Sequence, residues 1–237
     1  MRRVLPALLP IALVSTASAQ DAISADRPGF ATGPGTVARG VTQAELGFEW
    51  APETDAVTLP FALLRYGIGE ATEVRLAWSG VVTGTGETDT LGGGVEIKHT
   101  LREGEGASPT LGVLVGVNVP GDGGPLNPNA GFLWSSSLGD AWSVFGTATL
   151  GAPSADGERR LVGTNAVGVS RALGSKAGFF VEHFVSVTEG GDEETQLIDG
   201  GLTYLVTDDL QIDVNGGVSV GGADADGFVG AGLAYRF

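Results

Sequence analysis

The chain has 237 residues, with 28 acidic against 13 basic side chains, a formal net charge of −15, 40 glycines and no cysteine. So large an acidic surplus argues against nucleic acid as a partner, because a phosphate backbone is bound mainly through lysine and arginine. The absence of cysteine excludes a disulfide framework and thiolate metal sites.

The N-terminus has the pattern of a secretory signal peptide, which we expect to be residues 1–19. Arg2 and Arg3 precede an apolar run over residues 4–14, and Ala17-Ser18-Ala19 supplies small residues before the expected cleavage site. After residue 19 no stretch approaches the roughly 18 consecutive apolar residues of a transmembrane helix, so a membrane location would require a closed β-barrel.

The next segment, residues 20–40, is rich in Gly, Pro, Ala and Asp and has no regular apolar period. We expect a loop rather than a second domain. It could lie in the periplasm or fold into the barrel mouth as a plug, and the sequence leaves both open.

From residue 41 to 237 the chain alternates between apolar and small or polar residues with a period of two, which is typical of half-buried strands. In residues 111–119, for example, Leu111, Val113 and Val115 share one face while Gly112 and Gly116 share the other. Strands of about ten residues suffice to cross an outer membrane at a tilt. The pattern predicts an all-β fold, a transmembrane antiparallel up-and-down β-barrel of about 12 strands following a cleaved signal peptide. The expected strands are residues 43–50, 58–68, 72–82, 91–101, 111–119, 129–137, 142–150, 161–173, 176–187, 196–206, 210–220 and 228–237.

Short and long connections alternate, as expected for periplasmic turns and outer loops. One exception is residues 102–108, a longer connection on the expected periplasmic side, which leaves the placement of the neighbouring strands open. Twelve strands would enclose a lumen between that of a filled eight-stranded barrel and that of an open porin. A narrow pore is therefore geometrically possible.

The last predicted strand carries Val229, Ala231, Leu233, Tyr235 and Phe237 on one face. Outer-membrane barrels typically present such a terminal aromatic residue to their assembly machinery. We therefore expect a monomeric protein of the cell outer membrane, surrounded by membrane lipid and lipopolysaccharide. The assembly machinery would recognise the strand that ends at Phe237.

The expected strand register places charged side chains of both signs on the lumen face. They could form an ion-paired network that closes the barrel, or the polar lining of a channel for a small-molecule solute. The pore radius would distinguish the two. The lumen-lining candidates are Glu45, Glu49, Arg65, Glu73, Arg75, Glu96, Lys98, Glu182, Asp199, Asp213 and Arg236.

The same register places five phenylalanines on the lumen face, more than we expect in a purely aqueous porin. We hypothesise that they form a hydrophobic constriction for an apolar solute, although they could instead only fill the interior. They are Phe61, Phe145, Phe180, Phe184 and Phe228.

The longer loops carry most of the acidic surplus, against Arg159 and Arg160. These residues could be solvated loop side chains, could enrich cations at the mouth, or could bridge divalent ions to lipopolysaccharide. The loop acids are Glu53, Asp55, Glu87, Asp89, Asp122, Asp156, Glu158, Glu189, Asp192, Glu193, Glu194, Asp224 and Asp226.

The only histidines, His99 and His183, fall on the lipid-facing set of their strands. An outer-membrane lipid hydrolase, a minor alternative, would need such a histidine beside a serine and an orienting acid. Glu182 and Ser186 have the opposite parity to His183, so they should point inward while it points out. The sequence therefore predicts no catalytic residue, no metal site and no cofactor.

Several stretches resemble one bacterial outer-membrane family. They include Ala25-Asp-Arg-Pro-Gly-Phe30, Leu59-Pro-Phe-Ala-Leu-Leu-Arg-Tyr-Gly67, Gly178-Phe-Phe-Val-Glu182 and Asp199-Gly-Gly-Leu-Thr-Tyr204, together with the closing strand. The family is named for the MetA pathway of phenol degradation and is often labelled simply a transporter family. The resemblance spans nearly all of the chain after the signal peptide. It implies a barrel and the uptake of aromatic or other small hydrophobic compounds; a closed barrel that binds through its acidic surface loops is the alternative.

Overall fold

The computed structural model describes residues 22–237 except 85, 87, 156, 192–193 and 223–226. The expected signal peptide lies outside the described residues. So do some of the loop acids named above, namely Glu87, Asp156, Asp192, Glu193, Asp224 and Asp226.

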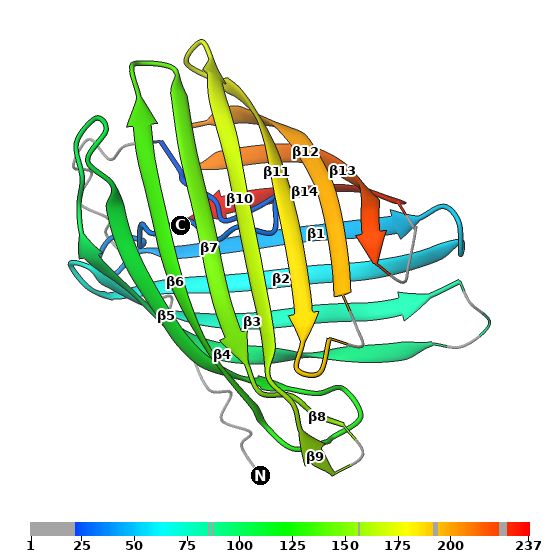
Figure 1. Ribbon diagram of the computed structural model, residues 1–237. Coiled ribbons are helices and arrows are strands. Elements are labelled where there is room, and N and C mark those ends of the chain that lie inside the picture. The colour runs from blue at the N-terminus through cyan, green and yellow to red at the C-terminus, as the bar shows by residue number, and fades with distance from the viewer. Residues whose placement is uncertain (1–21, 85, 87, 156, 192–193, 223–226) are drawn as a thin grey trace, which may run out of the picture.

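Twelve antiparallel strands close into one barrel, in which each strand pairs with its neighbours along the chain and β1 pairs with β14 (Figure 1). This confirms the predicted fold class. No helix formed by the described residues is long and apolar enough to cross a membrane. The strands are β1 (Thr42–Ala51), β2 (Ala56–Gly69), β3 (Thr72–Thr83), β4 (Asp89–Arg102), β5 (Thr110–Val119), β6 (Asn127–Leu138), β7 (Trp142–Gly151), β10 (Val162–Leu173), β11 (Ala177–Thr188), β12 (Glu194–Thr207), β13 (Leu210–Gly222) and β14 (Gly227–Arg236).

The remaining two strands, β8 (Ser154–Ala155) and β9 (Glu158–Arg159), form a small separate hairpin between β7 and β10. Its arm is held to the barrel by Arg159, which donates to the carbonyl oxygens of Ala152 at 2.7 Å and Leu126 at 3.0 Å. Two-residue strands are too short to show a period, so the sequence predicted only a loop here.

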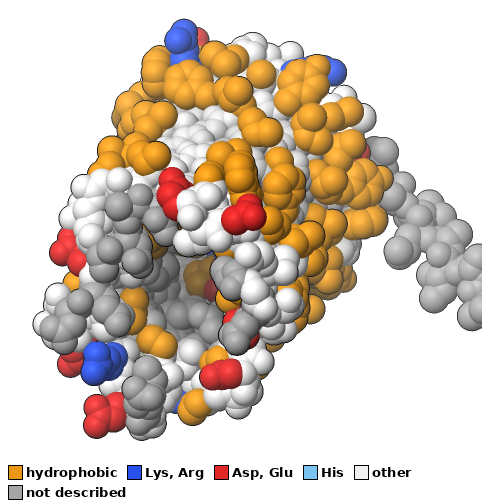
Figure 2. All heavy atoms as spheres, turned by 90° about the vertical axis from the view of Figure 1, so that its right-hand side faces the viewer, with side chains coloured by type: hydrophobic (Ala, Val, Ile, Leu, Met, Phe, Trp, Pro, Cys, Tyr) orange, Lys and Arg blue, Asp and Glu red, His pale blue; other side chains and the backbone are white. Residues whose placement is uncertain are grey.

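Large apolar side chains cover the outer wall because alternate residues of each strand point away from the lumen. In β5, Leu114 is 6% exposed whereas the next residue, Val115, is 53% exposed. Figure 2 shows these side chains as a broad apolar surface on the outside of the barrel. Exposed Tyr66, Tyr204 and Tyr235 lie near the strand ends on the side of the chain termini, as in the aromatic girdles of outer-membrane barrels.

The longer connection between β4 and β5 is genuine, and the strands beside it lie where the sequence placed them. Its backbone groups are satisfied locally, since Arg102 Nη2 donates to Pro109 O at 2.8 Å and Gly104 N donates to Thr110 Oγ1 at 3.0 Å. These bonds let a seven-residue connection end two strands without a tight turn.

Residues 22–40 lie inside the barrel, where Figure 1 shows them as the blue trace behind β6, β7 and β10. Ile23 and Val37 are 5% and 7% exposed. Ile23 N donates to Asp208 O at 2.7 Å at the turn between β12 and β13, and Gly40 N donates to Gly67 O at 2.8 Å in β2. Of the two placements that the sequence left open, the structure has the one inside the barrel, and we call residues 22–40 the lumen segment.

Candidate functional site: a divided lumen

Asp26 is the charged centre of the lumen segment. Its Oδ2 lies 2.9 Å from Lys98 Nζ, 3.4 Å from Arg75 Nη2 and 3.5 Å from Arg65 Nη1. Burial opposes the ionised form of Asp26, but the Arg65, Lys98 and Arg75 cations outweigh it and hold the pKa of Asp26 below its ordinary value. The carboxylate therefore stays charged and joins the lumen segment to β2, β3 and β4.

The three cations are neighbours because of strand register. Arg65 pairs with Arg75 across β2 and β3, and Glu73 pairs with Lys98 across β3 and β4. Two like charges side by side are tolerated because acids flank them: Arg65 Nε lies 2.9 Å from Glu73 Oε1, and Arg65 Nη1 lies 3.1 Å from Glu45 Oε1. All of these side chains are almost fully buried, so the pairs are held in a water-poor interior.

The second charged contact of the lumen segment joins Arg27 Nη2 to Asp213 Oδ1 at 3.0 Å. The guanidinium lies against the inner face of the wall at Gly47 and Gly232, which carry no side chain. A Cβ at either position would lie within 2.4 Å of it. The two glycines are paired in the register of β1 and β14. Only glycine at both positions leaves room for the Arg27 side chain.

Wall carboxylates also accept hydrogen bonds from the backbone of the lumen segment. Glu45 Oε2 accepts from Arg27 N at 3.0 Å, and Glu73 Oε2 accepts from Val37 N at 2.7 Å. Glu182 accepts from Phe30 N through Oε1 and from Ala31 N through Oε2 at 3.2 Å. Several of the acids expected to line the lumen thus bind this segment instead of facing solvent.

The lumen segment separates cavities on its two sides. Two outer cavities of about 370 and 400 Å³ share Phe30, Thr32 and Arg75 in their linings. An inner cavity of about 660 Å³ lies toward the turns that join β10 to β11 and β12 to β13. Residues 26–29 line both the first outer cavity and the inner one, so they form the partition between them.

The five predicted phenylalanines line cavities on both sides of this partition and do not form one ring. Phe184 stacks on Phe30 with ring centroids 4.4 Å apart, and Phe228 meets Phe30 edge to face at 5.8 Å. Phe61 lines the first outer cavity, whereas Phe145 and Phe180 line the inner one. Phe30 thus contacts both Phe184 and Phe228, although the sequence did not predict it as a site residue.

The remaining predicted lumen residues lie at different depths. Glu96 contacts Arg75 Nε at 3.5 Å and borders the second outer cavity. Asp199 pairs with Glu182 in the register of β11 and β12, so two carboxyl groups adjoin on the inner face of the wall. Glu49 borders the first outer cavity, and Arg236 pairs with Asp209 at the rim near the chain termini.

His99 and His183 are both exposed on the outer wall, and Thr72 Oγ1 lies 2.9 Å from His99 Nδ1. Glu182 is buried on the inner face, and Ser186 shares its parity on β11. A hydrolase would bring the three residues together, but His183 lies on the outer face of the wall and Glu182 and Ser186 lie on the inner face.

Sequence reasoning missed Asp26, Arg27 and Phe30 as site residues. The Asp26-Arg-Pro-Gly-Phe30 run has no periodicity that would place it in a strand, and in the sequence it stands out only by its resemblance to the family. Two charges and an aromatic residue in an otherwise small, loop-like segment are the one local signal that could have pointed to the lumen.

At the end with the longer loops the barrel is visibly hollowed, and acidic side chains stand around the opening (Figure 2). The described loop acids are mostly exposed, although Glu53 accepts from Gly227 N at 3.3 Å and Asp55 accepts from Trp50 Nε1 at 3.2 Å. The entrance to the outer cavities is therefore acidic.

A model of the family described as "Putative MetA-pathway of phenol degradation" matches residues 25–237. The chain belongs to this family. The match begins one residue before Asp26, so the family pattern includes the lumen segment as well as the barrel. No curated protein matches the chain in sequence.

Solved structures with the same fold are outer-membrane channels. The NanC porin superposes with a TM-score of 0.66 at 9% identity, covering 82% of this chain and 100% of that one. An outer-membrane channel from Pseudomonas putida F1 gives a TM-score of 0.63 at 14% identity, covering 89% and 99%. The KdgM porin, solved with a disordered oligogalacturonate, gives 0.57 at 10%, covering 82% and 99%. At these identities the likeness establishes the fold.

Proposed function

We propose that this protein is an outer-membrane channel for passive uptake of small solutes with an apolar or aromatic part, and that the lumen segment is its constriction. The observation that carries the proposal is the divided lumen: an outer vestibule, lined by aromatic, amide and hydroxyl groups, ends on residues 26–29, with a second cavity behind them.

The lining of the vestibule supports a mixed solute. Phe30, Phe61 and Phe228 offer apolar faces in the first cavity, and Asn118, Asn129 and other neutral polar groups offer hydrogen bonds in the second. Small-molecule sites usually combine predominantly apolar walls with a few placed polar groups. A purely ionic filter would instead leave charged rings without partners, whereas most of the charges here are paired.

The lumen segment can act as a constriction because it is held by noncovalent contacts at separate points along the barrel. Its displacement, in part or as a whole, would join the outer cavities to the inner one. The direct test is planar-bilayer conductance of the refolded protein from residue 20 onward, compared with the same protein lacking residues 20–40.

We expect small steps or rare openings from the intact protein and larger, frequent steps after the deletion. Uptake into proteoliposomes of a neutral aromatic compound such as benzyl alcohol should rise in parallel. A matched control deletes the β8–β9 arm, residues 154–159, which lies in an outer loop and should leave the conductance nearly unchanged. Equal conductance with and without residues 20–40 would contradict the assignment of the constriction.

The buried ion-pair network favours the second candidate, a closed structural or surface-binding barrel. Asp26, Arg65, Glu73 and Lys98 form a cluster that could seal the lumen permanently. Silence from both proteins in the bilayer, together with surface binding that is lost when the acidic loops are removed, would support this candidate over the channel.

The remaining assignments belong to the same proposal. Residues 1–19 would be cleaved on export, both chain termini would lie in the periplasm, and the acidic mouth would face outward among lipopolysaccharide. The closing strand would be recognised by the barrel assembly machinery through Phe237, and the barrel would act as a monomer without a cofactor. N-terminal sequencing of protein isolated from outer membranes tests the cleavage directly.

A further inference from the structure

Glu49 differs from the other charged side chains that line the two outer cavities. The others each form an ion pair, whereas Glu49 forms no ion pair or hydrogen bond within the described part of the chain. The nearest cation, the Arg27 guanidinium, lies beyond ion-pair distance from Glu49 and is bound to Asp213. Glu49 is half-buried and lines the first outer cavity. A carboxylate in such a position has capacity for a ligand. The paired members are Asp26, Arg27, Glu45, Arg75 and Glu96.

A second oxygen acceptor, Asn215 Oδ1, lies two strands from Glu49, with Gly230 on the strand between them. In the register, Glu49 pairs with Gly230, and Gly230 pairs with Asn215. Asn215 donates Nδ2 to Pro28 O at 3.1 Å, which directs its Oδ1 over the glycine, 2.6 Å from where a Cβ would be. The wall therefore has a slot at Gly230 between two acceptors, one of them charged.

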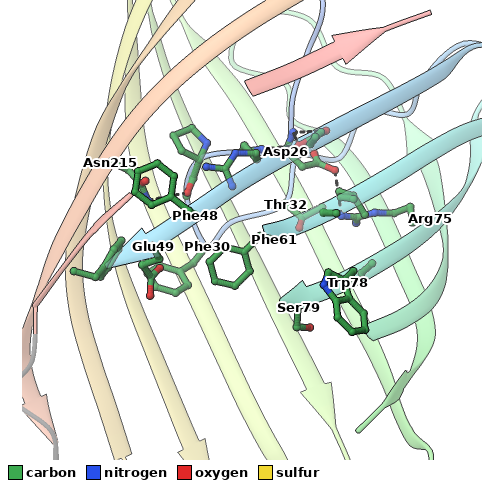
Figure 3. Close-up of a pocket in the computed structure, with 18 residues that line it drawn as sticks. Asp26, Phe30, Thr32, Phe48, Glu49, Phe61, Arg75, Trp78, Ser79 and Asn215 are labelled. Carbon is green, nitrogen blue, oxygen red and sulfur yellow. Dashed lines mark hydrogen bonds and ion pairs between the residues drawn. The ribbon is translucent and has the colours of Figure 1, made fainter. Parts of the chain in front are cut away.

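Aromatic rings complete the surroundings of the slot. Figure 3 shows Glu49, Phe30 and Phe61 in the lining of the cavity, together with Asn215 from β13. Phe228, two residues before Gly230 on β14, also lines this cavity and contacts Phe30 edge to face at 5.8 Å. Aromatic faces attract cations, and a carboxylate with aromatic rings is the usual composition of an organic ammonium site.

The charge of the entrance agrees with a cationic ligand. The two basic residues that line the first outer cavity, Arg27 and Arg75, are both engaged by acids. Acidic side chains surround the mouth above it (Figure 2). Such a field raises the local concentration of cations and repels anions.

We propose that the first outer cavity is a binding site for a small organic ammonium solute, with its nitrogen between Glu49 and Asn215 Oδ1 and its apolar body against Phe30, Phe61 and Phe228. The proposal rests on the channel function and names the substrate class of its outer site. The cavity, of about 370 Å³, is large enough for an arylalkylammonium ion.

The test compares three probes of similar size: phenethylammonium, phenethyl alcohol and phenylacetate. Binding is measured by isothermal titration calorimetry on the refolded protein from residue 20 onward in detergent micelles. We expect the ammonium ion to bind more tightly than the alcohol, and the carboxylate to bind least.

Glu49→Gln should weaken phenethylammonium binding by at least about tenfold, because a hydrogen bond to a charged group is lost, and should change alcohol binding by less than about twofold. Glu158→Gln removes the same charge from the exposed β8–β9 hairpin and is the matched control; it should leave both affinities unchanged. Gly230→Ala keeps every charge but fills the slot, and should weaken the ammonium ion selectively as well. Folding of each variant is checked by its heat-modifiable shift on a gel.

The outcomes separate this inference from the channel proposal. Equal affinity for phenethylammonium in the parent protein and in Glu49→Gln would overturn the ammonium site, as would a parent protein that binds the alcohol as tightly as the amine. In both cases uptake of neutral solute in proteoliposomes would leave the channel standing. A parent protein that neither binds nor passes any of the three probes would overturn both.

Discussion

Two parts of the barrel wall differ in the charge of the side chains that they present to the lumen. On β1 to β4 the inner face carries Glu45, Arg65, Glu73, Arg75 and Lys98, all buried and all in contact with the lumen segment or with one another. On β5, β6, β7 and β10 the buried inner residues are neutral, such as Leu114, Leu133, Thr147 and Ala166. The charged wall binds the lumen segment through ion pairs, whereas the neutral wall contacts it through the hydrogen bonds of Thr147 to Thr32 and borders open space in the second outer cavity.

This difference shows that anchoring the lumen segment and passing a solute require different kinds of wall. A buried charge must have its partner at close range, so a charged wall is a poor surface for a passing solute and a good one for a fixed segment. A neutral amphipathic wall can release what it binds. Breaking contacts on the charged wall should therefore affect the lumen segment most, and changes on the neutral wall should affect it least.

The largest effect is expected from Arg65→Ala. Without the guanidinium, Glu45 and Glu73 lose a partner in a buried site, and breaking a buried pair from one side costs about 3–5 kcal/mol. We expect release of the lumen segment before any loss of the barrel. Proteinase K should then cut between residues 24 and 37 in the variant but not in the parent protein, in which Ile23 and Val37 are buried. Full protection of that stretch in the variant would contradict the anchoring role.

Asp26→Asn should have the next largest effect, because it removes the charge that the three cations of the wall share. A hydrogen bond to a charged group contributes about 1.5–3 kcal/mol, so we expect partial release, seen as faster amide hydrogen exchange in residues 22–40. Ala38→Gly, an exposed position in the same segment, is a control that should change exchange only locally.

The pH dependence of this anchor follows from the lowered pKa of Asp26. A carboxyl whose folded pKa is lowered contributes its full stability above its unfolded value, about 3.9, and loses it as the pH falls through the folded value. Exchange protection due to Asp26 should thus be the same at pH 7 and at pH 5 after correction for the intrinsic rate. Loss of that protection between pH 7 and pH 5 would contradict a charged, cation-held Asp26.

Phe30→Ala tests the boundary between the two outer cavities. It removes the stacking with Phe184 and the edge contact with Phe228 but no charge, at a cost of about 1–2 kcal/mol because Phe30 is 39% exposed. We expect the lumen segment to stay seated while uptake of benzyl alcohol increases. Tyrosine at the same position keeps the ring and should behave like the parent protein. Unchanged uptake in Phe30→Ala would show that this ring does not limit passage.

The smallest effect is expected on the neutral wall. Thr164→Val breaks the 2.6 Å hydrogen bond between the hydroxyls of Thr149 and Thr164, worth about 1 kcal/mol. Hydrogen exchange of residues 22–40 should not change. An increase there comparable to that of Asp26→Asn would remove the distinction between the two walls.

The barrel could be predicted from the sequence because most of each strand alternates between apolar and small or polar residues, despite a few register shifts. The local alternation predicts that Leu114 is buried and that its neighbour Val115 is exposed. It also predicts that Arg65, Glu73 and Lys98 point into the barrel. The loop hairpin at Ser154–Arg159 was missed because it is too short to have a period.

The site was less accessible to sequence reasoning because it depends on contacts between distant segments. Parity showed that Glu45 and Glu182 face inward, but not that the partners of these acids are backbone amides of residues 26–31. Nor could parity show that Phe145 and Phe180 lie on the other side of a partition from Phe61. Nothing periodic marks residues 22–40, so their place in the lumen became visible only with the whole barrel.

The claim that the lumen segment is seated in the barrel is tested most directly by a disulfide trap, which the natural absence of cysteine makes clean. Thr32 N donates to Thr147 Oγ1 at 2.9 Å, and the same hydroxyl donates to Thr32 O at 2.9 Å, so the two residues are in direct contact. The double variant Thr32→Cys with Thr147→Cys, refolded and mildly oxidised, should form an internal cross-link in nearly all molecules. Thr32→Cys paired with Thr203→Cys on β12 should not. Free thiols at residues 32 and 147 after oxidation, in a barrel that has folded, would contradict the divided lumen.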